Sequence, residues 1–459
     1  MHRGRVLRSL LAILALGAAR SAAQQRLAIS GATLIDGTGA PPRTATVVIE
    51  GSRIAAIGGA PPAGARIVDG RGKYLVPGFW DSHVHLLHTD PATLGVFLAN
   101  GVTGIREMGG DVARTRAWRA EVEAGRLPGP RIFFSGPILE RGTYFENLRR
   151  MEGELGSGFV RLMERTRIAV GAPAEARGAI DSVRALGADF VKVRTTSNRE
   201  TALAILREAE RAGLKVAGHA PDGATPGELA AAGFASIEHG FWPPLFDYSA
   251  AERRHLFAPM VRHGTFLTPT LISGHQARVV PDSVGLGVIA DSSNRRDPRR
   301  RYVSDTMLVY WRRFYASKRF ESPLDWRAIA RFGIADVASA DSAGVQLLAG
   351  TDLGVTMIYP GFSLHDELAL LAEAARVPPV RVLQAATRNA AMVLGIVDSV
   401  GTIAIGMAAD LVLLDANPLA DIRNTRRIRA VIARGRLFDR AALDSLLARG
   451  ARAARPGDP

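Results

Sequence analysis

Short runs of alternating apolar and polar residues occupy both ends of the chain. Near the N-terminus they read LAISGATLIDGTG, ATVVIEGSRIAAIG and ARIVDGRGKYLVPG, with Asp36-Gly37 and Glu50-Gly51 among the turns. The pattern returns near the C-terminus in GTIAIGMAADLVLLDANP and IRAVIARGRLF. A period of two with glycine at the turns predicts antiparallel β-strands. We therefore expect residues 24–75 and 395–445 to form one small β domain built from both ends of the chain.

Between residues 76 and 394 the pattern changes to short apolar segments that alternate with helical stretches. Helical patterns such as NRETALAILREAERAG and PGELAAAG end at a glycine, a common signal for the C-terminal end of a helix. The apolar segments are, in order, YLVPGFWDSHVH, GVTGIREM, RIFFSGP, DFVKVRTT, KVAGHA, SIEHG, TFLTPTL and VQLLAGTD. Eight strand–helix alternations predict an α/β fold, a (β/α)8 TIM barrel over residues 76–394.

Side chains that bind metals fall at the C-terminal ends of these expected strands, where TIM barrels carry their chemistry. In the segment FWDSHVH, His83 and His85 point to the same side, because residues i and i+2 of a strand share a face. The other candidates are Lys192 in the fourth strand, His219 after the fifth, His239 after the sixth and Asp352 after the eighth. Each of them alone is an ordinary structural residue, but their joint placement favours a metal site.

Imidazole and carboxylate ligands suit zinc, and a catalytic zinc keeps one position for water. Four histidines and one aspartate exceed what one tetrahedral ion needs, so either some are not ligands or two ions are present. Two ions about 3.5–4 Å apart require a bridge. Burial and like charge favour the neutral amine of Lys192, which can react with carbon dioxide to give an anionic carbamate bridge. The alternative is that Lys192 pairs with an acidic neighbour inside the barrel.

Composition narrows the classes of function. The 459 residues include no cysteine, so disulfides are excluded and a metal site must use histidine, carboxylate or modified lysine. The formal charge is +14, but the chain has only four lysines and its arginines are scattered, which argues against a nucleic-acid surface. The run RRDPRRR at 295–301 is expected to be a solvated loop, with attraction of an acidic substrate as the alternative.

The N-terminus has the pattern of an export signal. Arg3, Arg5 and Arg8 precede the apolar stretch LLAILAL, and Ser21-Ala22-Ala23 provides the small residues that a signal peptidase needs. The apolar stretch is too short to span a bilayer. We expect residues 1–23 to be a cleaved signal peptide and the mature protein, with no further membrane segment, to be periplasmic or secreted.

The chain resembles the amidohydrolase superfamily in a series of motifs that occur in the family's order. They are PGFWDSHVH, DFVKV, VAGHA, IEHG, LAGTD, PGFSLHDELALLAEA, LQAATRNAAMVLGI and GTIAIGMAADLVLLDANPL. The resemblance covers roughly residues 26–440 and is greatest to the imidazolonepropionase-like and Xaa-Pro or Xaa-Arg dipeptidase-like branch. It implies a barrel with a composite β-sandwich and two divalent ions, most often zinc. By motif, His83, His85 and Asp352 would bind the more buried ion, His219 and His239 the second, and carboxylated Lys192 would bridge them.

Two departures from these relatives affect the expected substrate. Imidazolonepropionase and related deaminases use one metal and a glutamate shortly after the strand-5 histidine, whereas here Asp222 and then Glu228 follow His219 at other spacings. Dipeptidase-like relatives often have a tyrosine after that histidine and a histidine after strand 3, where this chain has Ala220-Pro221 and SGPILERGTYFEN. The residues considered as substitutes for holding substrate are Arg141, Tyr144 and His88.

These patterns together predict a metal-dependent amidohydrolase that cleaves a dipeptide or N-acyl amino acid with a metal-bridging hydroxide, Asp352 taking and returning the proton. Long segments at 138–170 and about 275–335 should cover the barrel mouth. MLVYWRRFYASKRF, in the second, is expected either as a lid or as a helix packed on the barrel. The alternatives are an ester or lactone hydrolase on the same site, a mononuclear imidazolonepropionase-like enzyme or deaminase, and a non-catalytic scaffold. The expected partner is a small amide or peptide, and a homo-oligomer stays open.

Overall fold

The computed structural model describes residues 26–221, 224–240, 248–317 and 326–455. The expected signal peptide, Asp222 and the last residues of MLVYWRRFYASKRF lie outside the described residues. Within the described part, no helix combines the length and apolar character needed to cross a membrane.

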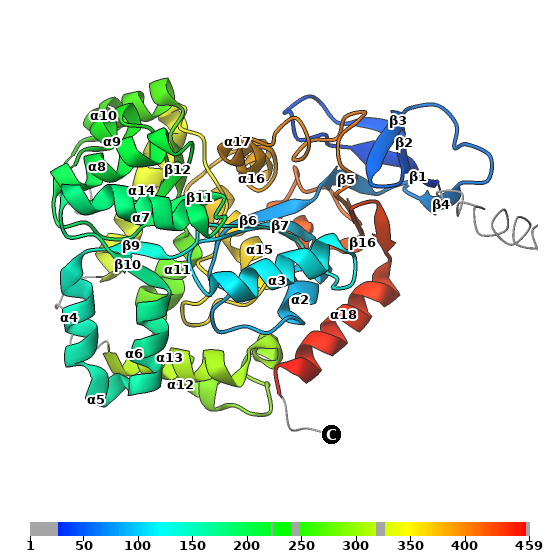
Figure 1. The fold of residues 1–459 in the computed structure, drawn as a ribbon. Coiled ribbons are helices and arrows are strands. Elements are labelled where there is room, and N and C mark those ends of the chain that lie inside the picture. The colour runs from blue at the N-terminus through cyan, green and yellow to red at the C-terminus, as the bar shows by residue number, and fades with distance from the viewer. Residues whose placement is uncertain (1–25, 222–223, 241–247, 318–325, 456–459) are drawn as a thin grey trace, which may run out of the picture.

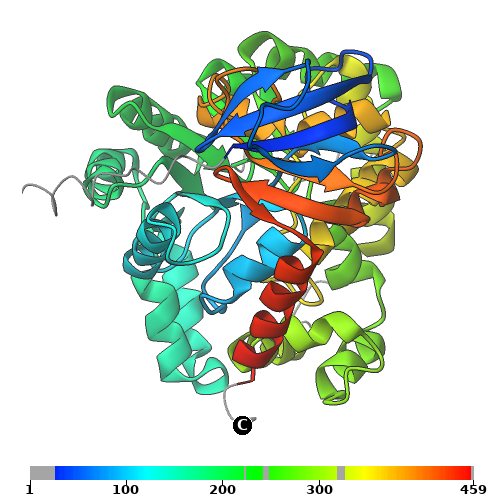
Figure 2. The same ribbon diagram turned by 90° about the vertical axis from the view of Figure 1, so that its right-hand side faces the viewer.

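The first of three sheets is mostly antiparallel and joins the two ends of the chain (Figure 1). In spatial order it contains β17 (Arg436–Phe438), β16 (Ile428–Ala433), β15 (Leu411–Leu414), β5 (Tyr74–Pro77), β1 (Leu27–Leu34), β2 (Arg43–Glu50) and β3 (Arg53–Ile57), with β4 (Arg66–Asp69) beside β1. A separate apolar core lies under this sheet, with Ile29 and Leu75 from one end of the chain and Leu411 and Ile432 from the other. Figure 2 shows strands from both ends side by side in this domain.

The other two sheets are parallel and supply the barrel. One contains β6 (Phe79–Val84), β7 (Val102–Glu107) and β8 (Arg131–Phe134). The other contains, in spatial order, β10 (Arg167–Ala169), β9 (Ile138–Glu140), β11 (Phe190–Val193), β12 (Lys215–Gly218), β13 (Phe234–Glu238) and β14 (Phe266–Thr268).

Single hydrogen bonds and bridges join these two sheets into one closed barrel. The Asp189 N–H donates to the Phe134 carbonyl at 2.9 Å, which connects β8 to the start of β11. On the opposite side, the segment VQLLAGTD lies between β14 and β6. It forms an isolated bridge between Leu347 and Leu267, and its Ala349 carbonyl accepts the Ser82 N–H at 2.8 Å. The eighth expected strand is therefore present as a closing segment without a continuous ladder. The predicted fold, a (β/α)8 barrel with a β-sandwich domain, is confirmed.

Helices follow the strands and surround the barrel (Figure 1). They are α2 (Thr93–Ala99), α3 (Val112–Glu123), α4 (Gly142–Arg150), α5 (Glu152–Leu155), α6 (Ser157–Arg165), α7 (Ala176–Ala185), α8 (Arg199–Arg211), α9 (Pro226–Ala231), α10 (Ala250–His263), α11 (Leu271–Gly274), α12 (Asp282–Ala290), α13 (Asp305–Ser317), α14 (Trp326–Ala343), α15 (Phe362–Ala369), α16 (Pro379–Ala385), α17 (Arg388–Leu394) and α18 (Arg440–Ala453). Side-chain caps fix where some of these helices begin. At the first turn of α8, for example, the Asn198 side chain accepts the Thr201 N–H.

The terminal domain and the barrel share a continuous strand path. β5 pairs with β1 and β15 in the terminal sheet, and after Gly78 the chain continues directly as β6 of the barrel. Gly78 allows this close passage, because a Cβ at this position would lie 2.0 Å from Thr103 Oγ1. The strand that ends with the first two candidate ligands is thus anchored in the terminal domain.

The arginine run at 295–301 is not a simple solvated loop, which corrects the expectation. Arg300 is 8% exposed and donates to the Ile289 carbonyl at 2.9 Å. Arg299 forms ion pairs with Asp297 and Asp366, both at 2.8 Å. Asp297 belongs to the run itself, whereas Ile289 lies in α12 and Asp366 in α15, so the run connects its segment to these two helices. None of its arginines lines the large cavity described below.

Candidate metal centre and its cavity

The six candidate ligands lie at the C-terminal ends of neighbouring parallel strands, around one cavity of about 810 Å³. Five of them line this cavity: His85, Lys192, His219, His239 and Asp352. His83, the sixth, is fully buried beneath it. The even spacing of parallel strands brings these ends together although the residues are far apart in sequence.

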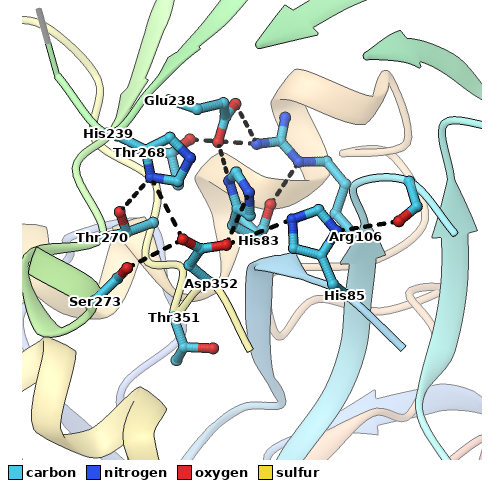
Figure 3. A network of polar contacts seen from close by, with 12 residues as sticks. His83, His85, Arg106, Glu238, His239, Thr268, Thr270, Ser273, Thr351 and Asp352 are labelled. Atoms are coloured by element: carbon cyan, nitrogen blue, oxygen red, sulfur yellow. Dashed lines mark hydrogen bonds and ion pairs between the residues drawn. The ribbon is translucent and has the colours of Figure 1, made fainter. Parts of the chain in front are cut away.

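Asp352 is central to the cluster (Figure 3). Its Oδ1 lies 3.6 Å from His83 Nε2 and 3.4 Å from His85 Nε2, and its Oδ2 lies 3.9 Å from His239 Nδ1. His83, His239 and Asp352 each offer a ligand atom within 4.8 Å of the others. Three residues at these separations can hold one cation without large side-chain movement.

Lys192 and His219 extend the cluster to a second position. The imidazole ring of His219 lies 4.6 Å from that of His239, measured between centroids. Lys192 is 1% exposed, and its Nζ makes no hydrogen bond to any described residue. Pairing with an acidic neighbour, the alternative considered for this lysine, is not seen in the described residues. A buried amine without a partner is costly unless something else satisfies it.

The buried imidazole of His83 is oriented by a chain of charged groups. Its Nδ1 lies 2.8 Å from Glu238 Oε2, so Nδ1 carries the proton and Nε2 is directed towards Asp352. Glu238 in turn accepts from Arg106 Nη2 at 2.7 Å, and Arg106 Nε donates to the Ser82 carbonyl at 2.6 Å. A carboxylate that holds the far nitrogen of a histidine is the usual support of a metal ligand.

Two candidate ligands occupy strained backbone conformations. His239 and Asp352 have φ of 66° and 60°, values that side chains other than glycine adopt only when the surroundings fix them. Thr270, with φ of 46°, is also left-handed, and its Oγ1 lies 2.7 Å from His239 Nδ1. Ser273 donates to Asp352 Oδ2 at 3.0 Å. The Thr270–Ser273 segment therefore orients both side chains.

Burial sets the ionisation of the cluster. It lowers the pKa of Lys192 to about 8 and that of His239 to about 4, and it also holds the pKa of His219 well below its usual value. For Asp352, burial alone would raise the pKa, but the neighbouring His239, His85 and His83 outweigh burial and hold it well below the usual range. Neutral imidazoles, an ionised carboxylate and a readily deprotonated amine are the forms that bind cations.

The three residues considered for substrate binding all line the cavity. Arg141 precedes α4, Tyr144 lies within it, and His88 follows β6. His88 stacks on Tyr310 of α13, with 4.5 Å between the ring centroids. Because Tyr310 lines the cavity while Trp311 is fully buried, α13 is both part of the cavity wall and a packed helix. The two interpretations of this segment are therefore compatible.

Several functional neighbours were not singled out from the sequence. Arg194 lies two residues after Lys192, so the period of a strand could have found it. Glu238 directly precedes His239 in IEHG, and its role follows only from its contact with His83. Thr270 and Ser273 sit in a segment without regular periodicity and reach the site only through the fold.

A family model described as "Amidohydrolase family" matches residues 74–438. The chain therefore belongs to the amidohydrolase family, and the predicted resemblance is confirmed. Hydrolysis of C–N bonds is the activity for which the curated relatives of this chain are named.

Individual relatives agree with this assignment. Over 93% of its length the chain matches a structure assigned as a prolidase from Bifidobacterium longum, with 99% of that chain covered, 26% identity and a TM-score of 0.69. It is 48% identical over 64 residues to an N-acyl-D-aspartate deacylase of Alcaligenes xylosoxydans xylosoxydans, 14% of this chain and 13% of that relative. It is 31% identical over 129 residues to an adenine deaminase of Deinococcus radiodurans, 26% of this chain and 24% of that relative. The chain thus spans less than a quarter of the curated relatives that it matches.

Proposed function

We propose that this chain is a binuclear metal hydrolase that cleaves the amide bond of a dipeptide or an N-acyl amino acid. The observation that carries the proposal is the buried Lys192 amine, which has no hydrogen-bond partner among the described residues although it faces a cluster of histidines and a carboxylate. A carbamate formed on this amine would satisfy it and supply a two-oxygen bridge.

The donor set fits two divalent cations, with zinc the favoured one. His83, His85 and Asp352 would hold the more buried ion, His219 and His239 the other, and carbamylated Lys192 would contact both. His83 supports this assignment, because its buried Nε2 has no hydrogen-bond partner among the described residues and points to the centre of the cluster. The strained φ angles of His239 and Asp352 are consistent with a site selected for ligation.

Divalent ions at this position would lower the pKa of a bound water and polarise the substrate carbonyl. Asp352 would accept the proton of the attacking water on a carboxylate oxygen and deliver it to the leaving amine. Ser273 and the imidazoles around Asp352 keep this carboxylate oriented and ionised before attack.

An amide substrate is favoured over a purine. The next glutamate after His219 is Glu228, which forms the capping box of α9 with Thr225 and pairs with Arg199 at 2.6 Å. Glu228 does not line the cavity, and Glu238, which does, is held by His83 Nδ1 and Arg106 Nη2, so among the described residues no glutamate shortly after His219 is placed to serve deaminase chemistry. Relatives named prolidase and N-acyl-D-aspartate deacylase act, by their names, on amide bonds.

We also propose that the enzyme acts outside the cytoplasm, after removal of residues 1–23. The support is the sequence pattern of that segment. N-terminal sequencing of exported protein should begin near Gln24, and a start elsewhere would contradict the proposal.

Metal content per chain tests the proposed centre. Wild type and Lys192→Ala are purified without chelators and measured by plasma mass spectrometry. We expect about two ions in wild type and one or none in the variant, because the bridge is lost. Lys215→Ala is the matched control, since Lys215 Nζ donates to the Val393 carbonyl and the residue does not line the cavity. A single ion that is indifferent to Lys192 would instead indicate a mononuclear enzyme.

A further inference from the structure

Arginines dominate the charge of the cavity wall beyond the metal cluster. The arginines that line it are Arg141, Arg167, Arg194 and Arg278, and the carboxylates are Glu238, Asp336 and Asp352. Two of these carboxylates form ion pairs with arginines that do not line the cavity: Glu238 with Arg106 at 2.7 Å and Asp336 with Arg253 at 3.8 Å. Asp352 belongs to the metal cluster. Among the described residues, the wall beyond the metal cluster therefore carries an excess of positive charge.

Two of these arginines are built into a fixed arrangement around one tyrosine. The Arg167 and Arg194 guanidinium carbons lie 5.0 Å and 5.3 Å from the centre of the Tyr144 ring. Behind them the fully buried Glu140 contacts Arg194 Nη1 at 2.9 Å and Arg167 Nε at 3.6 Å. Thr195 also donates to Glu140, at 2.5 Å. The arginines are thus held by a buried carboxylate and an aromatic face.

The charges of this arrangement match one negative group. Two guanidinium groups and one carboxylate leave one net positive charge. Arg194 uses Nη1 to contact Glu140, while its Nε and Nη2 have no hydrogen-bond partner in the described part of the chain. Its side chain is 40% exposed, so these donors can reach a ligand. A planar guanidinium with free donors suits the two oxygens of a carboxylate.

The arrangement is adjacent to the metal cluster. Arg194 follows β11, two residues after Lys192, and its charge acts on both Lys192 and His219. In a dipeptide or N-acyl amino acid, the carboxylate is separated from the scissile nitrogen by a single carbon. A carboxylate at Arg194 would therefore keep the amide near the candidate ligands.

We infer that Arg194, supported by Glu140, Arg167 and Tyr144, forms a subsite for a single carboxylate next to the scissile amide. This inference rests on the proposed hydrolase function and makes its substrate class narrower: amides that bear one carboxylate beside the leaving nitrogen. After the fifth strand this chain has Ala220 and Pro221, which offer no polar side chain to hold a substrate. Arg194 would take over the binding of the substrate carboxylate.

The kinetic test compares two substrates with the same acetamide bond, N-acetylphenylalanine and N-acetyl-2-phenylethylamine, which lacks the carboxylate. Arg194→Met should lower kcat/KM for the acid about 10- to 100-fold and leave the neutral amide within about 2-fold, as expected for one charge-assisted contact. Arg194→Lys should recover part of the loss. Arg165→Met is the control, because its side chain is 71% exposed and does not line the cavity. Equal losses on both substrates, or no preference for the acid in wild type, would overturn the subsite.

A binding measurement separates this inference from the proposed function. Calorimetry compares 3-phenylpropanoate with 3-phenylpropan-1-ol, on protein as purified and after chelator treatment. Wild type should favour the carboxylate about 10-fold or more in both forms, and Arg194→Met should lose most of that preference. A preference that disappears with the metal, or survives Arg194→Met, contradicts the subsite. Carboxylate binding without hydrolysis of any amide would contradict the proposed function alone, whereas hydrolysis without carboxylate preference would contradict the subsite alone.

Discussion

At the scale of single residues, the site combines groups whose burial would be unfavourable without a function. Lys192 is a buried amine without a partner among the described residues, and Asp352 is a carboxylate held among imidazoles. The left-handed backbone of Asp352 adds strain to this cost. Such costs are concentrated where ligation or catalysis compensates for them.

Asp352→Asn tests the proton transfer at this scale. Asparagine keeps the shape and one oxygen donor but cannot accept and return a proton. We expect metal content to stay near the wild-type value and kcat to fall about 10²- to 10⁴-fold, the usual share of general acid–base catalysis. Metal analysis and steady-state kinetics on the same preparation check this result. Near-full activity would remove Asp352 from the proposed proton transfer.

Glu367 is a second residue with a specific effect on the site. Its buried carboxylate accepts the N–H groups of Leu271 and Ile272 at 3.0 Å and 2.7 Å. These two residues lie between Thr270 and Ser273, which contact His239 and Asp352. Glu367→Ala should weaken metal retention about 10- to 100-fold, and Glu367→Gln, which keeps an acceptor, should weaken it less. Competition with a chelator measures the effect.

The control for that variant is Glu373→Ala. The Glu373 side chain is 42% exposed and pairs with Arg423, away from the cavity wall. Equal metal retention in Glu367→Ala and wild type would show that the Thr270–Ser273 segment is held by other contacts.

At the scale of elements, the closing segment of the barrel explains how His83 is positioned. Gly350 passes so close to β6 that a Cβ there would lie 2.8 Å from His83 Cβ and 2.8 Å from Thr268 Cγ2. This proximity leaves the segment with isolated bridges in place of a regular ladder. The glycine in LAGTD is thus required by packing against a candidate ligand.

Gly350→Ala should therefore displace His83 or the closing segment. We expect a loss of about 1–3 kcal/mol in the free energy of unfolding, typical of overpacking, together with reduced metal content. Gly178→Ala in α7 is the matched control, because a Cβ there meets nothing within 4 Å. Urea unfolding and metal analysis give the two values, and an unchanged Gly350→Ala protein would contradict the packing argument.

Elements also show what the sequence could predict. Strand ends could be read from apolar runs because side-chain periodicity is local, and this placed the six candidate ligands. The eighth strand itself could be predicted, but its irregular pairing could not, because that pairing accompanies the contact between Gly350 and His83, 267 positions earlier. Similarly, Glu140, Tyr144 and Arg194 come from separate elements, and their convergence depends on how the barrel closes. Local patterns therefore identified the candidate ligands but not their supporting contacts.

At the scale of the whole molecule, buried polar groups connect distant elements. His365 of α15 is 2% exposed; its Nδ1 lies 3.0 Å from Thr425 Oγ1 and its Nε2 lies 3.1 Å from the Asn100 carbonyl. It thereby connects α15 with the segment before β16 and with the end of α2. Burial lowers the pKa of His365 to about 4.

This depressed pKa predicts a pH dependence of stability. Below the ordinary histidine pKa of about 6.5, the unfolded chain takes up a proton that the folded chain binds only near pH 4, so stability is lost as pH falls between these values. The loss in the free energy of unfolding that is due to His365 approaches about 3 kcal/mol. The decrease in the free energy of unfolding between pH 7.5 and pH 4.5 should therefore be smaller in His365→Gln than in wild type. Urea unfolding of metal-free protein at pH 7.5 and 4.5 measures it.

The exposed His255 provides the comparison for this pH effect. His255→Gln should show the same pH dependence of stability as wild type, whereas His365→Gln should show a weaker one. Parallel pH profiles of wild type and His365→Gln would exclude His365 as a source of acid sensitivity.

The direct passage from β5 through Gly78 into β6 has a consequence for engineering the protein. A domain exchange that cuts the chain between residues 77 and 79 would separate the strand of His83 from the sheet that anchors it. The ion pair between Arg131 and Asp410, at 2.6 Å, would be divided by the same exchange. Chimeras between relatives should therefore fold best when residues 74–84 and the C-terminal strands that pair with them come from the same parent.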